Sequence, residues 1–225
     1  MKRFVIIPSG GSGKRLNASL PKQYIKFNGK ELFVYTIEKF QNSSLADIII
    51  IAAQPEYFGL INDCIKKYKL SKVLKVVEGG KERQDSVYNA LLSCNAEEND
   101  IVAVHDAARP LISSNLIDEA LKQAEIFDSI IVAIKAKDTL LKGDNFVESY
   151  IEREGIYYVQ TPQIFRAGIL LNSMKKAYSE NFYGTDESML VKKAGYKIKI
   201  VEGSSLNIKV TTQSDLDFFS ALCSQ

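Results

Sequence analysis

Tryptophan is absent from the chain, histidine occurs once, and cysteine occurs three times among 225 residues. The cysteines are odd in number and far apart, so their pattern indicates neither a disulfide framework nor a zinc site. Cys64, Cys94 and Cys223 are more simply interpreted as small core residues in a reducing compartment. We therefore expect a cytoplasmic protein.

Apolar runs long enough to cross a membrane are also missing, since none approaches the ~18 residues that a span requires. The apolar run after Lys2 and Arg3 is interrupted by Pro8 and the glycines that follow it. It is too short for a signal peptide. We therefore expect no membrane partner.

An excess of charge of one sign is missing as well. The chain has 29 basic and 27 acidic residues and a net charge of +2, which argues against nucleic acid as the main partner. Its apolar content of 46% and charged content of 25% are those of an ordinary globular protein. The chain is long enough to bury a substantial core, and we expect one domain over residues 1–225.

Strand-like and helix-like segments alternate along the chain. Unbroken apolar runs, such as residues 48–53, are typical of strands that are covered on both faces. The predicted strands are residues 3–7, 48–53, 73–77, 101–105, 130–134, 197–201 and 207–210. The predicted helices are residues 32–40, 55–68, 84–94, 116–127, 166–178 and a last one that follows the capping pair Thr212 and Asp215. This order predicts an α/β fold with a doubly wound, mostly parallel, Rossmann-like sheet, whose ligands bind beyond the carboxyl ends of the strands.

The alternation breaks after Lys135. Residues 136–160 combine charges and glycines with β-rich pieces at 146–150 and 156–160. A structureless loop of this length is uncommon in a compact domain, and tyrosine and valine favour strands. We therefore predict a projecting β arm over residues 136–160, with a flexible solvent loop as the alternative. An arm of this kind exposes apolar side chains, so we expect it to pair with a second copy in a homodimer.

A glycine-rich loop, residues 8–15, follows the first strand. Glycines let the backbone approach a ligand closely, and successive N–H groups form a concavity that binds anions. The loop fails the Walker A pattern at Pro8 and Arg15, and it fails the dinucleotide fingerprint at Leu16. It therefore predicts a phosphate site of another kind, to which Arg15 and Lys22 add positive charge. A plain glycine-rich turn is the alternative.

Seven motifs occur in the order that is found in one enzyme family. They are Pro8-x-Gly10-Gly11-x-Gly13-x-Arg15, Pro21-Lys22-Gln23-Tyr24, Gly80-x-x-Arg83-x-x-Ser86-Val87, His105-Asp106-Ala107-Ala108-Arg109-Pro110, Thr161-Pro162-Gln163, Thr185-Asp186-Glu187 and Asn207-Ile208-Lys209-Val210-Thr211. Over nearly the whole chain they resemble the 2-C-methyl-D-erythritol 4-phosphate cytidylyltransferases, which are sugar-phosphate nucleotidyltransferases. The family loop usually begins Pro-Ala-Ala-Gly, so Ser9-Gly10 is a departure from it.

The resemblance implies a reaction of CTP with 2-C-methyl-D-erythritol 4-phosphate that yields the CDP-alcohol and pyrophosphate, with Mg²⁺ as cofactor. This is a step of the non-mevalonate isoprenoid pathway. The resemblance implies that Arg15 and Lys22 are the catalytic cations; a solvated pair at a helix start is the alternative. Asp106 is the expected carboxylate beside Mg²⁺, with capping of the next turn as its alternative. A phosphate monoester is already ionised near neutral pH, so His105 is interpreted as a packing residue.

The resemblance also implies which residues contact the two substrates. The polyol phosphate is expected to contact Arg153, Lys209, Thr139, Asp106 and Arg109, with Arg153 delivered by the arm of the partner subunit. CTP is expected to contact Ser9, Gly10, Gly11, Gly13, Gly80, Arg83 and Ser86, of which the last three form a pyrimidine-reading loop. A structural ion pair remains the alternative for Arg109, and a helix-start position remains the alternative for Ser86.

Two other functions remain open from the sequence. Ribitol 5-phosphate cytidylyltransferase shares the first loop and the segment around Lys209, although the run from Arg153 to Tyr157 looks more like the methylerythritol enzymes. A nucleotide-sensing module without catalysis is the other candidate. The joint presence of Arg15, Lys22, Asp106 and Lys209 argues against it.

Overall fold

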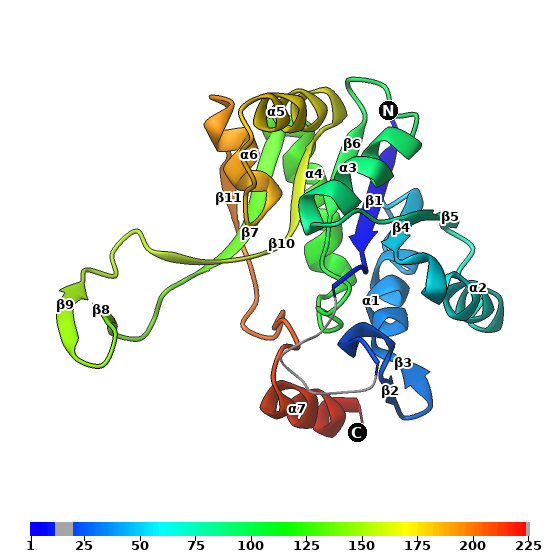
Figure 1. Ribbon diagram of the computed structural model, residues 1–225, viewed down its shortest axis with the longest axis horizontal. Coiled ribbons are helices and arrows are strands. Elements are labelled where there is room, and N and C mark those ends of the chain that lie inside the picture. The colour runs from blue at the N-terminus through cyan, green and yellow to red at the C-terminus, as the bar shows by residue number, and fades with distance from the viewer. Residues whose placement is uncertain (12–19, 224–225) are drawn as a thin grey trace.

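The computed structural model describes residues 1–11 and 20–223, and a seven-stranded sheet runs through its middle (Figure 1). The strands lie in the order β11-β7-β10-β6-β1-β4-β5. Their bounds are β1 Arg3–Pro8, β4 Ile48–Ala53, β5 Val73–Glu78, β6 Ile101–Val104, β7 Ser129–Lys135, β10 Tyr157–Arg166 and β11 Lys199–Glu202. Only β10 runs against the other strands of this sheet, since it is antiparallel to both β6 and β7. The predicted α/β fold with a mostly parallel sheet is confirmed.

Helices cover both faces of the sheet. They are α1 Leu32–Gln41, α2 Phe58–Lys67, α3 Arg83–Ser93, α4 Ser114–Phe127, α5 Ala167–Ser179 and α6 Glu187–Lys193. Helix α7 Gln213–Cys223 lies beyond the carboxyl edge of the sheet instead and packs against Leu32 and Val210 (Figure 1). One apolar cluster packs α1, α2 and α4 against Val5 and Ile51, and another packs α3, α5 and α6 against Ile6 and Ile50 on the opposite face. Successive residues of a strand point to opposite faces, so the unbroken apolar runs of β1 and β4 fill both clusters.

Strand β10 is longer than the sequence predicted. Its first residues pair with β7, where Tyr157 lies opposite Lys135 and Tyr158 opposite Ile134. The predicted arm of residues 136–160 therefore extends too far at its C-terminal end. The sequence does not predict that the strand continues through Thr161-Pro162-Gln163. This motif interrupts the apolar pattern, and proline lacks the N–H that donates a hydrogen bond between strands. The register shifts at the same place, between Val159 and Gln163.

The arm itself is a hairpin of β8 Leu140–Gly143 and β9 Val147–Ile151. Figure 1 shows it standing clear of the sheet and its helices. Several of its apolar side chains are exposed, with Phe146 86% and Tyr150 71% accessible to solvent. The projecting β arm is thus confirmed, and its apolar side chains have little cover within their own chain.

The segment 207–210, predicted as a strand, forms none. It crosses the carboxyl edge of the sheet as an irregular strap, where the Val210 N–H donates to the Ala108 carbonyl at 2.8 Å. The capping pair of the last helix is confirmed, since the Thr212 N–H donates to Asp215 Oδ2 at 2.8 Å and the Asp215 N–H donates to Thr212 Oγ1 at 3.3 Å.

Two smaller features complete the fold. A short hairpin of β2 Lys26–Phe27 and β3 Lys30–Glu31 precedes α1, and one-turn 3₁₀ helices span Lys22–Tyr24 and Pro55–Tyr57. No helix within residues 1–11 and 20–223 has the length and apolar character needed to cross a membrane.

Candidate active site

The loops that follow β1, β4, β5 and β6 lie at the carboxyl edge of the sheet, where ligands of such folds bind. The first glycine-rich loop follows β1, Gln54 follows β4, Gly80 closely follows β5, and Asp106 closely follows β6. A Cβ atom placed on Gly10 would lie 3.5 Å from Ser86 Oγ. The first glycine-rich loop is therefore in contact with the segment after β5.

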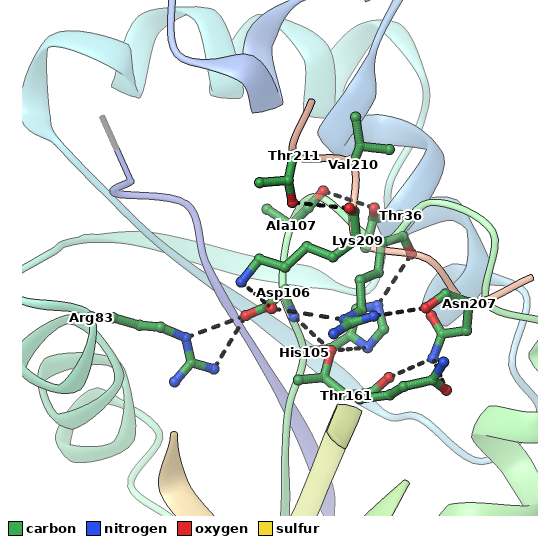
Figure 2. Close-up of polar contacts among 12 residues, drawn as sticks. Thr36, Arg83, His105, Asp106, Ala107, Thr161, Asn207, Lys209, Val210 and Thr211 are labelled. Atoms are coloured by element: carbon green, nitrogen blue, oxygen red, sulfur yellow. Dashed lines mark hydrogen bonds and ion pairs between the residues drawn. The ribbon is translucent and has the colours of Figure 1, made fainter. Parts of the chain in front are cut away.

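Asp106 lies at the centre of a group of cations (Figure 2). Its Oδ1 lies 3.2 Å from Arg83 Nη2, and its Oδ2 lies 2.7 Å from Lys209 Nζ and 3.8 Å from Arg109 Nε. Burial alone would raise the pKa of Asp106, but the charges of Arg83, Lys209 and Arg109 outweigh burial and hold that pKa well below its usual range. Asp106 is therefore ionised near neutral pH.

Arg83 also binds a second buried carboxylate. Its Nη1 lies 2.7 Å from Glu187 Oε1 and 2.9 Å from Oε2, and Glu187 is only 1% exposed. Burial raises the pKa of Glu187 even though Arg83 opposes the shift. Arg83, Arg109 and Lys209 together carry three positive charges against the two carboxylates, so the cluster retains one positive charge for an anionic ligand.

Arg109 supports the strap that carries Lys209. Its Nη1 donates to the Asn207 carbonyl at 2.7 Å, and Asn207 Nδ2 donates to the Thr161 carbonyl at 2.8 Å. Arg109 Nε is buried and has no hydrogen-bond partner among the described residues. A buried donor without a hydrogen bond is costly, and for this nitrogen the ion pair with Asp106 Oδ2 at 3.8 Å offsets part of that cost.

His105 is a packing residue, as interpreted from the sequence. It is fully buried, its ring meets that of Phe40 edge to face, and Thr161 Oγ1 lies 3.1 Å from its Nδ1. Burial lowers the pKa of His105 to about 3. The ring is therefore neutral near pH 7, and its contacts are those of a packing residue.

The segment after β5 is held together by hydrogen bonds of its own. Ser86 Oγ accepts from the Gly80 N–H at 3.0 Å and donates to the Glu82 carbonyl at 3.1 Å. Glu82 caps α3 in a capping box with Asp85. The Ser86 hydroxyl thus fixes the shape of the segment from Gly80 to Ser86. It also faces the first glycine-rich loop. The Gly80 carbonyl accepts no hydrogen bond from the described residues and remains available to a ligand.

Lys22 reaches the strap from the other side of the site. Its Nζ donates to the Val210 carbonyl at 2.7 Å, one residue beyond Lys209. Lys22 therefore lies beside the strap that carries Lys209, and its predicted catalytic role stays a prediction. Arg15 and Gly13 lie outside the described residues, and their predicted roles stay predictions.

Arg153 and Thr139 lie at the two ends of the arm hairpin in the sequence. Both are exposed, and Arg153 Nη1 donates to the Lys137 carbonyl. Within the described part of the chain, neither side chain forms a hydrogen bond or ion pair with the Asp106 cluster. The structure therefore brings together Lys22, Arg83, Asp106, Arg109 and Lys209, but not Arg153 and Thr139.

The residues at this edge fit a magnesium ion that is held mainly by substrate oxygens. The described residues contain no group of three histidine, cysteine or acidic side chains placed to hold a metal. Mg²⁺ in phosphate sites is bound by one or two carboxylates together with phosphate oxygens. Asp106 is a carboxylate at this edge, and the Lys209 side chain on its Oδ2 is 41% exposed, so the core does not enclose it.

Two residues of the site lacked a predicted role. Glu187 was noticed only as part of the Thr185-Asp186-Glu187 motif, because nothing in the sequence shows that it binds Arg83. Gln54 had no predicted role, although it comes directly after β4. Residues that directly follow the strands of a parallel sheet lie at the edge where ligands bind.

A parallel sheet with a glycine-rich loop after its first strand, and a cationic cluster beside that loop, suits a protein that binds two phosphate-bearing molecules. This places the chain among the nucleotidyltransferases. More specifically, the chain belongs to the 2-C-methyl-D-erythritol 4-phosphate cytidylyltransferase family, whose model matches residues 4–224. The family expected from the sequence is thus confirmed.

Similar proteins agree with this assignment. The 2-C-methyl-D-erythritol 4-phosphate cytidylyltransferase of Clostridium novyi is 37% identical over 218 residues, which cover 96% of this chain and 94% of that protein. The one from Lysinibacillus sphaericus is 38% identical over 223 residues, which cover 99% and 96%. The crystal structure of the Francisella tularensis enzyme of the same name matches with a TM-score of 0.84 at 34% identity, covering 98% of this chain and 99% of that one.

Proposed function

We propose that the carboxyl edge of this sheet transfers a cytidylyl group from CTP to 2-C-methyl-D-erythritol 4-phosphate. The products are 4-CDP-2-C-methyl-D-erythritol, an isoprenoid precursor, and pyrophosphate. Family membership over nearly the whole chain supports the reaction. The convergence of Arg83, Arg109 and Lys209 on Asp106 is the observation that supports this location, and Lys22 is bonded to the strap one residue beyond Lys209.

The chemistry explains why cations dominate the site. A phosphate oxygen of the alcohol phosphate attacks the α-phosphorus of CTP, the bond from that phosphorus to the bridging oxygen breaks, and pyrophosphate leaves. Both reactants are anions, and negative charge accumulates on the five-coordinate phosphorus. Fixed cations that meet this charge lower the barrier, and so does holding the reactants in line. Arg15 and Lys22 are the proposed cations at the α-phosphate.

The pyrimidine is assigned to the segment from Gly80 to Ser86. The cytosine amino group donates hydrogen bonds, and the free Gly80 carbonyl is an acceptor that matches it. Uracil presents an acceptor at the same place, which leaves two acceptors facing each other. Ser9, Gly10, Gly11 and Gly13 of the first loop are assigned to the rest of the nucleotide.

The alcohol phosphate is assigned to the other side of Asp106. Lys209 and Arg109 both lie beside Asp106 Oδ2, and they are the proposed cations for this phosphate. Arg153 and Thr139 do not reach the cluster in their own chain, so we assign them to the site of a partner subunit. The exposed apolar side chains of the arm support this homodimer, because pairing two arms would cover them.

Asp106 is the proposed protein ligand of Mg²⁺. When bound, the ion neutralises phosphate charge and draws the phosphate oxygens into place. Arg83 fixes one carboxylate oxygen of Asp106 and leaves the other to Lys209 or to the ion. We propose a cytoplasmic location because the three cysteines are all unpaired, as is usual in a reducing compartment.

The activity is tested by following pyrophosphate release with CTP and each of two alcohol phosphates. We expect turnover with 2-C-methyl-D-erythritol 4-phosphate and little with ribitol 5-phosphate. Ribitol 5-phosphate is not favoured as the substrate, since the family and the relatives named above are methylerythritol phosphate enzymes. Equal or better turnover with ribitol 5-phosphate would overturn the proposed acceptor.

A further inference from the structure

A chain of three charged side chains links helix α6 to Asp106. Glu187, the first residue of α6, accepts from Arg83 Nη1 at 2.7 Å and 2.9 Å, and it is 1% exposed. On its other edge Arg83 donates from Nε to Asp106 Oδ1 at 3.3 Å, and its Nη2 lies 3.2 Å from the same oxygen. All three guanidinium nitrogens of Arg83 therefore face carboxylates, and Glu187 forms the end of the chain that lies away from Asp106.

The first turn of α6 is anchored on both sides of Glu187. Asp186 caps the helix, since its Oδ1 accepts from the Met189 N–H at 3.0 Å. The Ser188 N–H donates to Gln163 Oε1 at 2.8 Å, and Gln163 on β10 is fully buried. Glu187 lies between these two anchored residues, so its carboxylate is held in place and determines where the guanidinium lies.

The contact of Arg83 with Asp106 differs from the frequent bidentate pair of arginine and carboxylate. In that pair two guanidinium nitrogens bind two different carboxylate oxygens. Here Nε and Nη2 both approach Oδ1, while Oδ2 lies 2.7 Å from Lys209 Nζ. Figure 2 shows Arg83 and Lys209 reaching Asp106 from different directions. Because Glu187 holds Nη1, the guanidinium is not free to turn so that it takes Oδ2 as well.

We propose that Glu187 is a positioning residue that keeps Oδ2 of Asp106 available. By holding Arg83 on Oδ1, Glu187 leaves Oδ2 to Lys209, which stays beside the site of the alcohol phosphate. A neutral side chain in place of Glu187 releases Nη1, and Asp106 is then the remaining carboxylate for Arg83. Arg83 takes both oxygens of Asp106 and displaces Lys209, whose side chain is 41% exposed and turns to solvent. The proposal rests on the proposed function, which assigns Lys209 to the alcohol phosphate.

The test is a double-mutant cycle of Glu187→Gln and Lys209→Ala that measures KM for the alcohol phosphate. Glutamine keeps the size of the side chain and removes its charge. We expect Glu187→Gln alone to raise KM about tenfold, the scale of one charge-assisted hydrogen bond. In the Lys209→Ala background it should raise KM no further, because its effect passes through Lys209. Independent effects would instead multiply in the double variant, and that result would overturn the positioning role.

Glu125→Gln is the matched control for the loss of a carboxylate beside an arginine. Glu125 Oε1 accepts from Arg3 Nε at 2.9 Å and from its Nη2 at 2.6 Å. Arg3 begins β1 at the amino edge of the sheet, away from the site. The control should have the KM of the wild type. A wild-type KM in Glu187→Gln as well would overturn the proposal.

Crystal structures give a second readout that does not depend on turnover. In Glu187→Gln, Arg83 should contact both oxygens of Asp106, and Lys209 Nζ should lie beyond hydrogen-bond distance of Oδ2. If this variant does not fold, the wild type with bound CTP supplies the test, because Arg83 should keep both Glu187 and Asp106 Oδ1. An Arg83 that leaves Glu187 to contact CTP, or that stays on Oδ1 alone in the variant, would overturn the positioning role. Failure of the wild type to turn over CTP and the alcohol phosphate would instead overturn the proposed function.

Discussion

Lys209 Nζ lies 2.7 Å from Asp106 Oδ2, while Arg83 holds the Oδ1 atom of the same carboxylate (Figure 2). The two cations differ in burial, with 41% of the Lys209 side chain exposed against 29% for Arg83. Arg83 is also fixed by Glu187. Lys209 is therefore the cation that is able to move from Asp106 to an incoming phosphate.

This relationship predicts the behaviour of Lys209→Ala. Loss of a charge-assisted hydrogen bond should raise KM for the alcohol phosphate about tenfold or more, with a smaller effect on KM for CTP. Steady-state kinetics with each substrate varied in turn measures the difference. Lys176→Ala, at an exposed lysine of α5, is the control and should behave as wild type. Equal increases in both KM values would contradict the assignment of Lys209 to the alcohol phosphate.

Lys22 is expected to act on the transition state rather than on binding alone. Lys22→Ala, and likewise Arg15→Ala, should lower kcat/KM by a factor of roughly 10² or more, the scale for one preorganised charged donor. Circular dichroism of each variant should match that of the wild type, so that the loss of turnover is separated from a loss of fold. Lys66→Ala on α2 serves as the control. Near-wild-type turnover in either variant would remove that residue from the catalytic role.

The segment from Gly80 to Ser86 predicts a preference for CTP over UTP. The preference follows from the Gly80 carbonyl, which accepts from a cytosine amino group and faces an acceptor in uracil. Ser86→Ala removes the hydroxyl that holds the Gly80 N–H, so it should raise KM for CTP and reduce the preference. Initial rates with both nucleotides measure it. A Ser86→Ala variant with unchanged KM and unchanged preference would speak against this segment as the reader of the base.

The central strands and the loops after them were predictable because their signals are local. β1 and β4 are unbroken apolar runs bounded by proline or by polar residues, and burial on both faces requires that pattern. The positions directly after the strands also identified Asp106 and Gly80, since ligands bind at the carboxyl ends in parallel sheets.

The features that escaped prediction depend on contacts between distant segments. The continuation of β10 through Thr161-Pro162-Gln163 carries no alternating pattern, and only its place between β6 and β7 makes it a strand. The strap at 207–210 looks like a strand but is held by Arg109 and Ala108 instead of by a neighbouring strand. Glu187 is unremarkable in the sequence until the fold places it beside Arg83.

Arg153 is predicted to act in the site of the partner subunit. Arg153→Ala should raise KM for the alcohol phosphate far more than KM for CTP, because a planar guanidinium binds phosphate with two hydrogen bonds. Mixing Arg153→Ala with Lys22→Ala subunits, at an alcohol phosphate concentration where each alone is nearly inactive, should restore activity. Random exchange gives roughly a quarter of the wild-type rate, since half of the dimers are mixed and each has one intact site.

The control for this mixing experiment is each variant incubated alone under the same conditions. Sedimentation measures whether the subunits have exchanged into dimers. Exchange without recovery of activity, or full activity of a monomer, would show that Arg153 does not act across a subunit interface.

The central claim is that the phosphate of the alcohol attacks the α-phosphorus of CTP at this site. It is tested most directly by supplying 2-C-methyl-D-erythritol 4-phosphate with ¹⁸O in its phosphate group, together with unlabelled CTP, and analysing the products by mass spectrometry. The account predicts one pyrophosphate for each CDP-alcohol, with all of the label in the CDP-alcohol and none in the pyrophosphate. Label in pyrophosphate, or release of pyrophosphate with CMP and no CDP-alcohol, would contradict it.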